Sequence, residues 1–231
     1  MSSPRILIVG TSHVPDEARR DLAKLWLRVV KNLNPGIDVM LIDSGSPFDP
    51  SKFLDIEVFR FEDNIGAISQ GQRDGSGRGF CKALEFGVER GYDYVVPWEA
   101  DMIFVLPVVP IIEKMDRVGV KVAAAFADPY QFLEWGFSFW SVKYVKESNF
   151  IKRYDWENSP RWPIPEFRVQ YLTQYEIFVL PFHGYRNSLN NMNIMNITQL
   201  FPYEPCKFLT HCIDHGLYYR MLDLNGVKLV D

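Results

Sequence analysis

Cysteine is scarce in this sequence. The 231 residues contain three, Cys81, Cys206 and Cys212, and no CxxC pair. Three scattered cysteines are too few for a disulfide framework or a four-cysteine zinc site, and an odd count without CxxC fits a reducing compartment. The composition therefore excludes the disulfide-rich secreted class.

Long apolar runs are also missing. The longest stretch, residues 102–112, is interrupted by Pro107 and Pro110 and is too short to span a bilayer. Residues 1–10 carry one arginine and only a short apolar run, Ile6–Val9, which is not the pattern of a signal peptide. We therefore expect no membrane span and a cytoplasmic location.

No excess of positive charge is present. Lys and Arg number 25 against 29 Asp and Glu, so the net charge is −4. This balance argues against an electrostatic grip on nucleic acid or anionic lipid. The sequence also lacks a repeat of constant period, which excludes solenoids and propellers. Its 47% hydrophobic and 23% charged residues predict a globular chain, most simply one large domain.

Apolar runs of strand length alternate with segments of helical periodicity in the first half. The expected strands cover residues 5–10, 37–42, 56–61, 92–98 and 120–126, and the expected helices cover 18–33, 80–88 and 110–118. This order predicts an α/β layer, with a mostly parallel sheet and helices on both faces. Ligands of such sheets bind at the carboxyl ends of the strands, where the strand order reverses.

The second half has a different character. Residues 130–205 are rich in Trp, Tyr, Phe and Pro, which predicts strands and long ordered loops packed on the sheet rather than a second independent domain. A helix over 217–224 and a closing strand over 227–230 are expected to complete the chain.

Glu99 and Asp101 form an acidic pair directly after an apolar strand. Carboxylates one residue apart, at the ligand edge of a sheet, can share a divalent cation and a diphosphate, and hard oxygen ligands suit magnesium or manganese. Spacing alone favours a solvated acidic turn, because two acids at i and i+2 are common. The apolar flanks and the position at the strand end favour a functional site.

A glycine-rich stretch, Gly71–Gly79, precedes the second helix. Glycines let backbone N–H groups approach an anion, and a helix N-terminus favours negative charge. Arg73, Arg78 and Lys82 could add contacts to a phosphate. The stretch lacks the GKS/T ending of a P-loop, and a flexible connector would have the same composition.

Other polar residues follow strands or precede helices. Asp43 could bind a base or ribose, or it could close its own turn. Asp214 could be a general base or only a helix N-cap. His211 and His215 are candidates for metal binding or proton transfer, although a histidine near a helix start is more often structural.

Taken in order, these segments resemble motifs of the large inverting family of GT-A fold glycosyltransferases, which use nucleotide sugars. Leu41–Pro47 resembles the family's VDDGSTD turn, and Asn64-Ile-Gly66 with the glycine- and arginine-rich helix start resembles its N-x-G and ArNxG segments. Tyr94–Asp101 resembles EYVxFLDAD, which contains the DXD motif. Residues 214–226 are similar to its ED-x-x-L-x-x-R-L motif followed by glycine. The resemblance covers about residues 5–104 and 208–230.

The resemblance implies a GT-A-like, Rossmann-like fold in a single domain over 1–231. Residues of about 1–104 would form the nucleotide-sugar-binding half, and about 105–231 the acceptor-binding and catalytic-base half. The partners implied are a nucleotide-sugar donor, with UDP-sugars favoured, and a glycan or other hydroxyl acceptor. The cofactor implied is a divalent cation, Mn or Mg. The oligomeric state stays open.

The resemblance also implies roles for residues. The donor-binding set is Thr11, Ser12, Asp43, Asn64, Arg78, Lys82, Glu99, Ala100 and Asp101. Within this set, the resemblance gives the base to Thr11, Ser12 and Asp43, and the diphosphate to Arg78 or Lys82. Asp101 would ligate the cation and Glu99 would reach the ribose or a metal-bound water. Asp214 would deprotonate the acceptor, and tryptophans of the second half, Trp135, Trp140, Trp156 and Trp162, could offer faces to sugar rings.

Three departures from the family pattern stand out. Glu99 replaces the first Asp of DXD, and Ile213 replaces the Glu before the catalytic Asp. The family often has a metal-binding histidine after the final strand, whereas this sequence ends at Asp231. Either His211 substitutes, or the metal has only Asp101 and phosphate oxygens, or the chain is part of a longer protein.

Alternative functions remain from other classes. A sugar-phosphate nucleotidyltransferase would carry a basic glycine-rich loop after the first strand, and Gly10–Pro15 contains no Lys or Arg. A non-catalytic nucleotide- or carbohydrate-binding module is compatible with the incomplete ED motif. A Rossmann oxidoreductase is disfavoured because GxGxxG follows neither of the first two strands.

Overall fold

The computed structural model describes residues 3–66, 73–128, 132–158, 165–173, 177–185, 209–211, 219, 222–223 and 227–229. The elements, in chain order, are β1 (Ile6–Ser12), α1 (Glu17–Leu33), β2 (Asp38–Asp43), the 3-10 helix η1 (Pro50–Lys52), β3 (Glu57–Arg60), α2 (Gly75–Glu89), β4 (Tyr94–Pro97), β5 (Met102–Ile103), α3 (Val109–Val118), β6 (Val122–Asp128), β7 (Phe132–Ser141), α4 (Val142–Glu147), α5 (Phe150–Tyr154), the 3-10 helix η3 (Trp156–Asn158), α6 (Pro165–Thr173), β8 (Ile177–Tyr185) and β9 (Leu209–His211).

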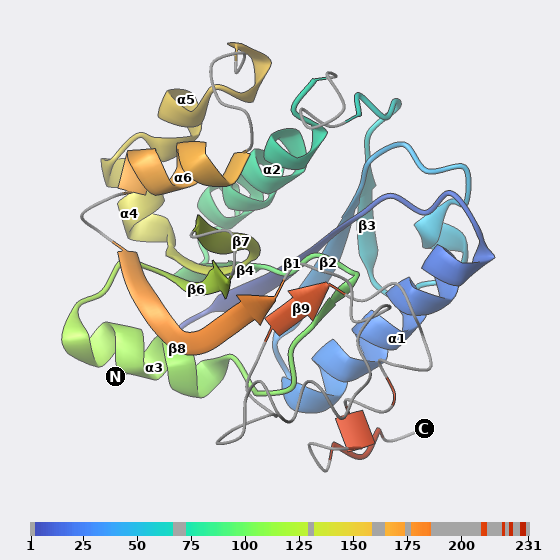
Figure 1. The fold of residues 1–231 in the computed structure, drawn as a ribbon, viewed down its shortest axis with the longest axis horizontal. Coiled ribbons are helices and arrows are strands. Elements are labelled where there is room, and N and C mark those ends of the chain that lie inside the picture. The colour runs from blue at the N-terminus through green and yellow to red at the C-terminus, as the bar shows by residue number, and fades with distance from the viewer. Residues whose placement is uncertain are drawn as a thin grey trace.

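Helices cover both faces of a central sheet, as the alternation of strands and helices predicts. Helices α1 and α3 lie on one face, and α2, α4, α5 and α6 gather on the other (Figure 1). Successive side chains of a strand point to opposite faces of the sheet, so an apolar strand contributes side chains to the hydrophobic core on each face. Ile6 and Ile8 of β1 pack in the cluster of Trp26 from α1, whereas Leu7 and Val9 pack in that of Phe80 from α2. Each such burial stabilises the fold by about 1.5–3 kcal/mol.

The sheet has the strand order β3-β2-β1-β4-β7-β6-β8-β9-β5 within the described residues. Strands β1, β2, β3 and β4 are parallel to one another. Strand β7 is antiparallel to both β4 and β6, and β5 is antiparallel to β9. Strands β6, β8 and β9 pair in parallel. The chain adds β2 and β3 on one side of β1 and then returns to place β4 on the other. The order therefore reverses between β1 and β4, where a binding crevice is expected.

The second half contains more helix than the sequence predicts. Strands β7 and β8 agree with the expected strands, but α4, α5 and α6 are helices in a region expected to contain strands and long ordered loops. Helices α4 and α5 are short, and their buried side chains, including Val145 and Phe150, pack in the same cluster as α2. Helices this short gain most of their stability from tertiary packing, which a local pattern does not reveal. The Asn-rich segment 187–196 lies outside the described residues.

The end of the chain also differs from expectation. Val227–Leu229 form no strand, so the expected closing strand is wrong for these residues. The N–H of Val227 instead donates to the carbonyl of Leu222 at 3.0 Å. Tyr219, Leu222 and Asp223 are helical, within the helix predicted over 217–224. In the described part of the chain, no helix is long and apolar enough to cross a membrane.

Candidate active site

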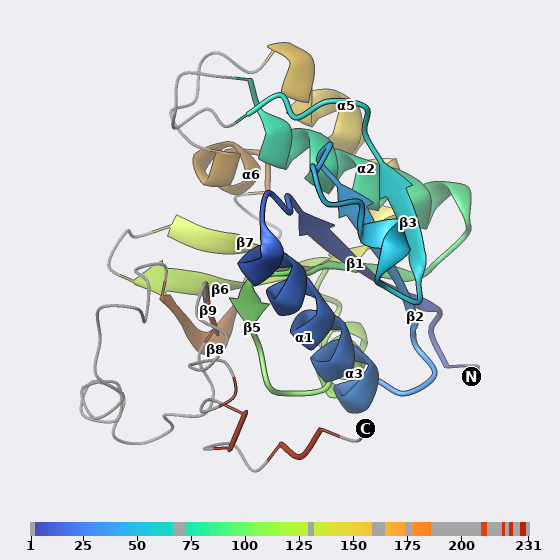
Figure 2. The same ribbon diagram turned by 90° about the vertical axis from the view of Figure 1, so that its right-hand side faces the viewer.

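A pocket of about 540 Å³ opens at the carboxyl ends of β1 and β4. Its walls come from the end of β1 and the segment after it (11–15), from Ser44 after β2 and from 99–101 after β4. Residues of α1 and of the start of α2 complete them. Figure 2 shows the first turn of α1 beside the carboxyl end of β1 and close to β5. The pocket thus occupies the crevice that the strand order defines.

Backbone hydrogen bonds hold the turn that contains Glu99, Ala100 and Asp101. The N–H of Ala100 donates to the carbonyl of Thr11 at 3.0 Å, and the N–H of Glu99 donates to the carbonyl of Gly136 at 2.8 Å. The turn is therefore fixed to β1 on one side and to β7 on the other. Both acidic residues and Ala100 line the pocket, as does Thr11.

Gly136 makes room for the Glu99 side chain. A Cβ at position 136 would lie 2.7 Å from Cδ of Glu99 and 2.8 Å from its Oε2. Real Cβ atoms do not approach other atoms so closely, so only glycine fits here without displacing the carboxylate. Gly136 was not singled out from the sequence, because a glycine inside a strand carries no sign of what crosses it.

An ion pair joins the acidic turn to α1. The guanidinium of Arg19 lies 2.6 Å from Oδ2 of Asp101, and the two side chains are 34% and 25% exposed. The N–H of Arg19 donates to Oδ1 of the N-cap residue Asp16 at 2.9 Å, which fixes the backbone of this first helical turn. Arg19 was not predicted as a site residue, because charged residues in the first turn of a surface helix are common.

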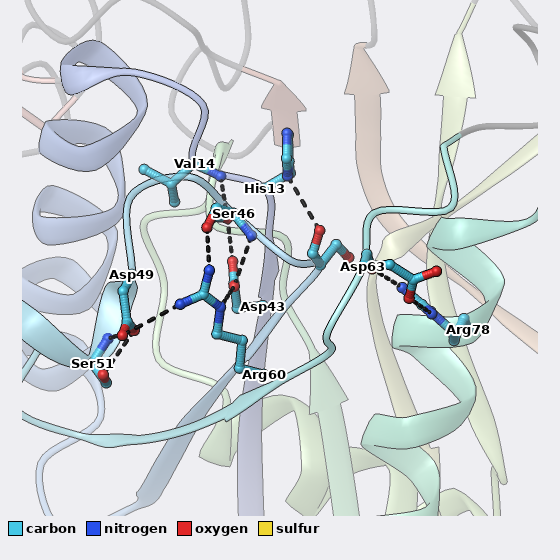
Figure 3. Close-up of polar contacts among 10 residues, drawn as sticks. His13, Val14, Asp43, Ser46, Asp49, Ser51, Arg60, Asp63 and Arg78 are labelled. Carbon is cyan, nitrogen blue, oxygen red and sulfur yellow. Dashed lines mark hydrogen bonds and ion pairs between the residues drawn. The ribbon is translucent and has the colours of Figure 1, made fainter.

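Asp43 lies behind the pocket rather than in its lining. Its carboxylate is fully buried, accepts hydrogen bonds from the N–H of Ser46 at 3.0 Å and from the Ser46 hydroxyl, and lies 3.2 Å from Nε of Arg60 (Figure 3). Both oxygens are thus used to close its own turn, which is the structural alternative considered for this residue. Its neighbour Ser44 lines the pocket, and the Ser44 carbonyl lies 3.3 Å from Nδ1 of His13.

The start of α2 and the N-x-G segment form another wall. Asn64, Gly66 and Gly75 all line the pocket, and the N–H of Gly75 donates to the carbonyl of Gly66 at 3.1 Å. A Cβ at position 75 would lie 2.3 Å from that carbonyl oxygen, so the close approach requires glycine. The side chain of Asn64 accepts from the N–H of Gly66 at 2.9 Å and closes the turn.

Arg78 and Lys82 are not brought to the pocket. Arg78 contacts Oδ1 of Asp63 at 2.8 Å, and its guanidinium stacks 3.9 Å from the centre of the Phe61 ring. The hydrogen bond from Arg78 lowers the pKa of Asp63. Lys82 pairs with Glu85 at 3.0 Å. Among the described lining residues, neither supplies the positive charge expected at a diphosphate.

Of the candidate metal ligand His211 and the candidate base Asp214, the structure describes only His211. The backbone of His211 pairs with Met102, the residue that follows Asp101, through the antiparallel β5–β9 pair. Asp214 lies outside the described residues. The side chains that the structure describes contain no group of three His, Cys, Asp or Glu residues able to hold a metal ion.

The tryptophans of the second half divide between core and surface. Trp135 and Trp140 are buried and pack against Phe80, with ring centres 4.4 and 5.2 Å away. They belong to the core and offer no face to a sugar. Trp156 lies nearer the surface, with the guanidinium of Arg73 5.6 Å from its ring centre. Trp162 lies outside the described residues.

The architecture is that of the GT-A type of glycosyltransferase fold. Comparison of structures agrees. Glycosyltransferase GlyE of Streptococcus pneumoniae TIGR4 matches with a TM-score of 0.56 and 11% identity, over 96% of this chain and 60% of GlyE. Mouse xyloside xylosyltransferase 1 matches with a TM-score of 0.53 and 9% identity, over 90% of this chain and 97% of the mouse chain. The bifunctional glycosyltransferase WbbM matches with a TM-score of 0.52 and 10% identity, over 99% of this chain and 45% of WbbM.

These identities establish the fold alone. The chain spans about 60% of the length of GlyE. No protein-family profile matches the sequence, and no curated protein matches it in sequence. The expected α/β fold of GT-A type, with a largely parallel sheet flanked by helices, is confirmed.

Proposed function

We propose that this protein is a glycosyltransferase that moves a sugar from a nucleotide diphosphate donor, with a UDP-sugar favoured, to a hydroxyl of a glycan or other acceptor. One observation carries the proposal. On a GT-A type fold, the Glu99–Asp101 turn lines a pocket of about 540 Å³ at the point where the strand order reverses. This is where nucleotides bind in open α/β sheets, and the volume suits a small-molecule ligand.

The donor would lie across the carboxyl ends of β1 and β4. Thr11, Ser12 and Asn64 line the pocket and can hydrogen-bond the base and ribose. The diphosphate would lie toward the first turn of α2, where Gly75 and Ser76 line the wall. A helix N-terminus attracts anions, and glycine allows close approach of the backbone. Asp43 would act indirectly, by holding the turn that presents Ser44.

The acidic residues fit a divalent cation. Glu99 and Asp101 place hard carboxylate oxygens in one pocket, and the absence of a side chain at Gly136 leaves the space that the Glu99 carboxylate needs. Asp101 would hold Mn²⁺ or Mg²⁺, with His211 as a further candidate ligand, and diphosphate oxygens would complete the set. When bound, such a cation stabilises the negative charge of the leaving diphosphate.

The transfer itself needs a base. By the family resemblance, Asp214 would accept the proton of the acceptor hydroxyl as its oxygen forms a bond to the anomeric carbon. The bond from that carbon to the phosphate oxygen breaks, and the nucleoside diphosphate leaves with the electron pair. Attack from the face opposite the leaving group inverts the anomeric configuration.

Calorimetric titration with a panel of UDP- and GDP-sugars, with and without Mn²⁺, tests donor binding. We expect one donor to bind, and Asp101→Asn to weaken its Mn²⁺-dependent binding by about tenfold or more, because the cation loses a carboxylate ligand. Glu113→Gln, an exposed acid on α3, is the matched control and should bind as the wild type does. A folded protein that binds no donor under either condition would rule out the proposal.

Product analysis tests turnover. Once a donor is known, acceptor screening followed by NMR of the product should show inverted anomeric configuration, and Asp214→Asn should abolish transfer while leaving donor binding intact. Retained configuration would contradict the role of Asp214. Donor binding without transfer to any acceptor would favour the non-catalytic binding module.

A further inference from the structure

Arg19 is the only lysine or arginine among the described residues that line the pocket. It comes from the first turn of α1 and lines the same pocket as Gly75 and Ser76 of α2. Its side chain is one-third exposed, and its guanidinium contacts Oδ2 of Asp101 at 2.6 Å. The group is therefore both inside the pocket and accessible to a ligand.

Arg60 and Arg78 are engaged by other acidic side chains. Arg60 contacts the carboxylates of Asp43 and Asp49 at 3.2 and 3.3 Å (Figure 3). Arg78 is nine-tenths buried on the Asp63 and Phe61 side of α2. Among the described residues that line the pocket, Arg19 is the one that can bring a full positive charge to an anion.

The pocket needs a positive charge at the position of Arg19. Glu99 and Asp101 place two acidic side chains in the pocket, and a nucleoside diphosphate brings further negative charge. A guanidinium presents paired N–H donors that match both carboxylate and phosphate oxygens. The same group that neutralises Asp101 can therefore turn to a phosphate, and its backbone stays anchored at the N-cap of α1.

We propose that Arg19 is a phosphate-binding residue which Asp101 holds at the pocket wall until the donor arrives. In this resting pair the guanidinium also competes with a divalent cation for the Asp101 carboxylate. When the diphosphate binds, Arg19 moves to its oxygens and releases Asp101 for the cation. This inference rests on the proposed donor site and adds to it a residue and an order of events.

The exchange has two consequences of opposite sign. Removing the Arg19 charge deprives the diphosphate of a partner, so binding of a nucleoside diphosphate without metal weakens. The same change leaves Asp101 without its guanidinium, so a divalent cation alone binds more tightly. A residue that only supported the shape of the pocket would weaken both when it is changed.

The test uses UDP and GDP in EDTA, and MnCl₂ alone, as probes of the full chain by calorimetry, with Mn²⁺ also followed by electron paramagnetic resonance. We expect Arg19→Gln to raise the Kd for the nucleoside diphosphate about tenfold and to lower the Kd for Mn²⁺ severalfold. Arg19→Lys should retain part of the diphosphate binding. Arg20→Gln is the matched control, because Arg20 pairs with Glu17 and Asp21 outside the pocket lining, and both Kd values should stay within twofold.

The outcomes separate this inference from the proposed function. Unchanged Kd values in Arg19→Gln, or weakening of both probes in a variant that melts like the wild type, would overturn the role of Arg19. Nucleoside diphosphate binding that requires Mn²⁺ even in the wild type would also overturn it, while the proposed donor site would stand. Absence of nucleotide and nucleotide-sugar binding under every condition would overturn both.

Discussion

Gly136 and Glu99 show how one residue can determine the position of another that is distant in sequence. The carbonyl of Gly136 accepts a hydrogen bond from the N–H of Glu99 at 2.8 Å, and the missing side chain leaves space for the Glu99 carboxylate. Gly136 thus fixes both the backbone and the side chain of the first acidic residue of the turn. We regard it as a positioning residue of the pocket.

Replacing Gly136 by alanine should displace the Glu99 carboxylate. The new Cβ would lie 2.7 Å from Cδ of Glu99, and we expect a loss of about 1–3 kcal/mol in the free energy of unfolding together with weaker donor binding in Mn²⁺. Urea unfolding and calorimetry measure the two effects. The double variant Gly136→Ala/Glu99→Ala relieves the clash, so it should recover stability without recovering binding. Wild-type binding by Gly136→Ala would contradict the positioning role.

The sequence predicted which segments lie at the pocket better than it predicted the directions of individual side chains. Thr11, Ser12 and Asn64 line the pocket, as do all residues of the Glu99–Asp101 turn. Arg78 and Lys82 were expected at the diphosphate but pair with Asp63 and Glu85, and neither is among the described residues that line the pocket. Which face a charged helical residue uses depends on the neighbours that tertiary packing brings, and a single sequence does not contain them.

At the scale of elements, the start of α2 is anchored to α5. Asp74, the N-cap of α2, accepts from the N–H of Gly77 at 2.7 Å and from the hydroxyl of Tyr154 at 2.9 Å. Asp74 and Tyr154 are both buried. Burial and the nearby Asp74 carboxylate raise the pKa of Tyr154 well above its usual range. The helix end that faces the pocket is therefore held by a residue of the second half.

Tyr154→Phe should lower the free energy of unfolding by about 1–3 kcal/mol, because the buried Asp74 carboxylate loses a hydrogen-bond donor. Urea unfolding at pH 7 measures the loss, with the exposed Tyr171→Phe as control. Since the folded protein holds the Tyr154 proton more tightly than the unfolded chain, the wild type should lose stability as pH rises above about 10, and the variant should lose less. An unchanged alkaline limb would contradict the assignment.

The elements that the sequence predicted are those with strong periodicity. Apolar runs and helical spacing predict β1, α1, β2, α2 and β4. A strand that is buried on both faces, as most of β1 is, appears in the sequence as a continuous apolar segment. Helix α6 has no apolar stripe: its buried residues include Glu166 and Arg168. Such a helix is stabilised by its surroundings and leaves little local pattern.

At the scale of the whole molecule, the pocket is built from segments that the sheet order brings together. The ends of β1, β2 and β4 meet the starts of α1 and α2, and the β5–β9 pair adds the backbone of residues 209–211 beside the acidic turn. A ligand in this pocket should therefore restrain several separate parts of the chain at once.

Hydrogen exchange measures that restraint directly. With Mn²⁺ and the nucleoside diphosphate selected by calorimetry, we expect slower amide exchange in peptides covering 11–15, 64–66, 75–79 and 99–103. Helix α3 (Val109–Val118) contributes no residue to the pocket lining and should exchange unchanged. Protection confined to α3, or to a single one of the four segments, would show that the ligand binds elsewhere.

The sequence by itself determined the α/β class, the order of the first strands and helices, and the acidic turn after β4, because each depends on local periodicity or on residues adjacent in the chain. Only the tertiary structure decided that Arg19 meets Asp101, that Gly136 makes room for Glu99, and that Asp43 supports its turn from behind the pocket. These contacts join distant segments whose approach is fixed by strand order and core packing. No spacing within one segment encodes them.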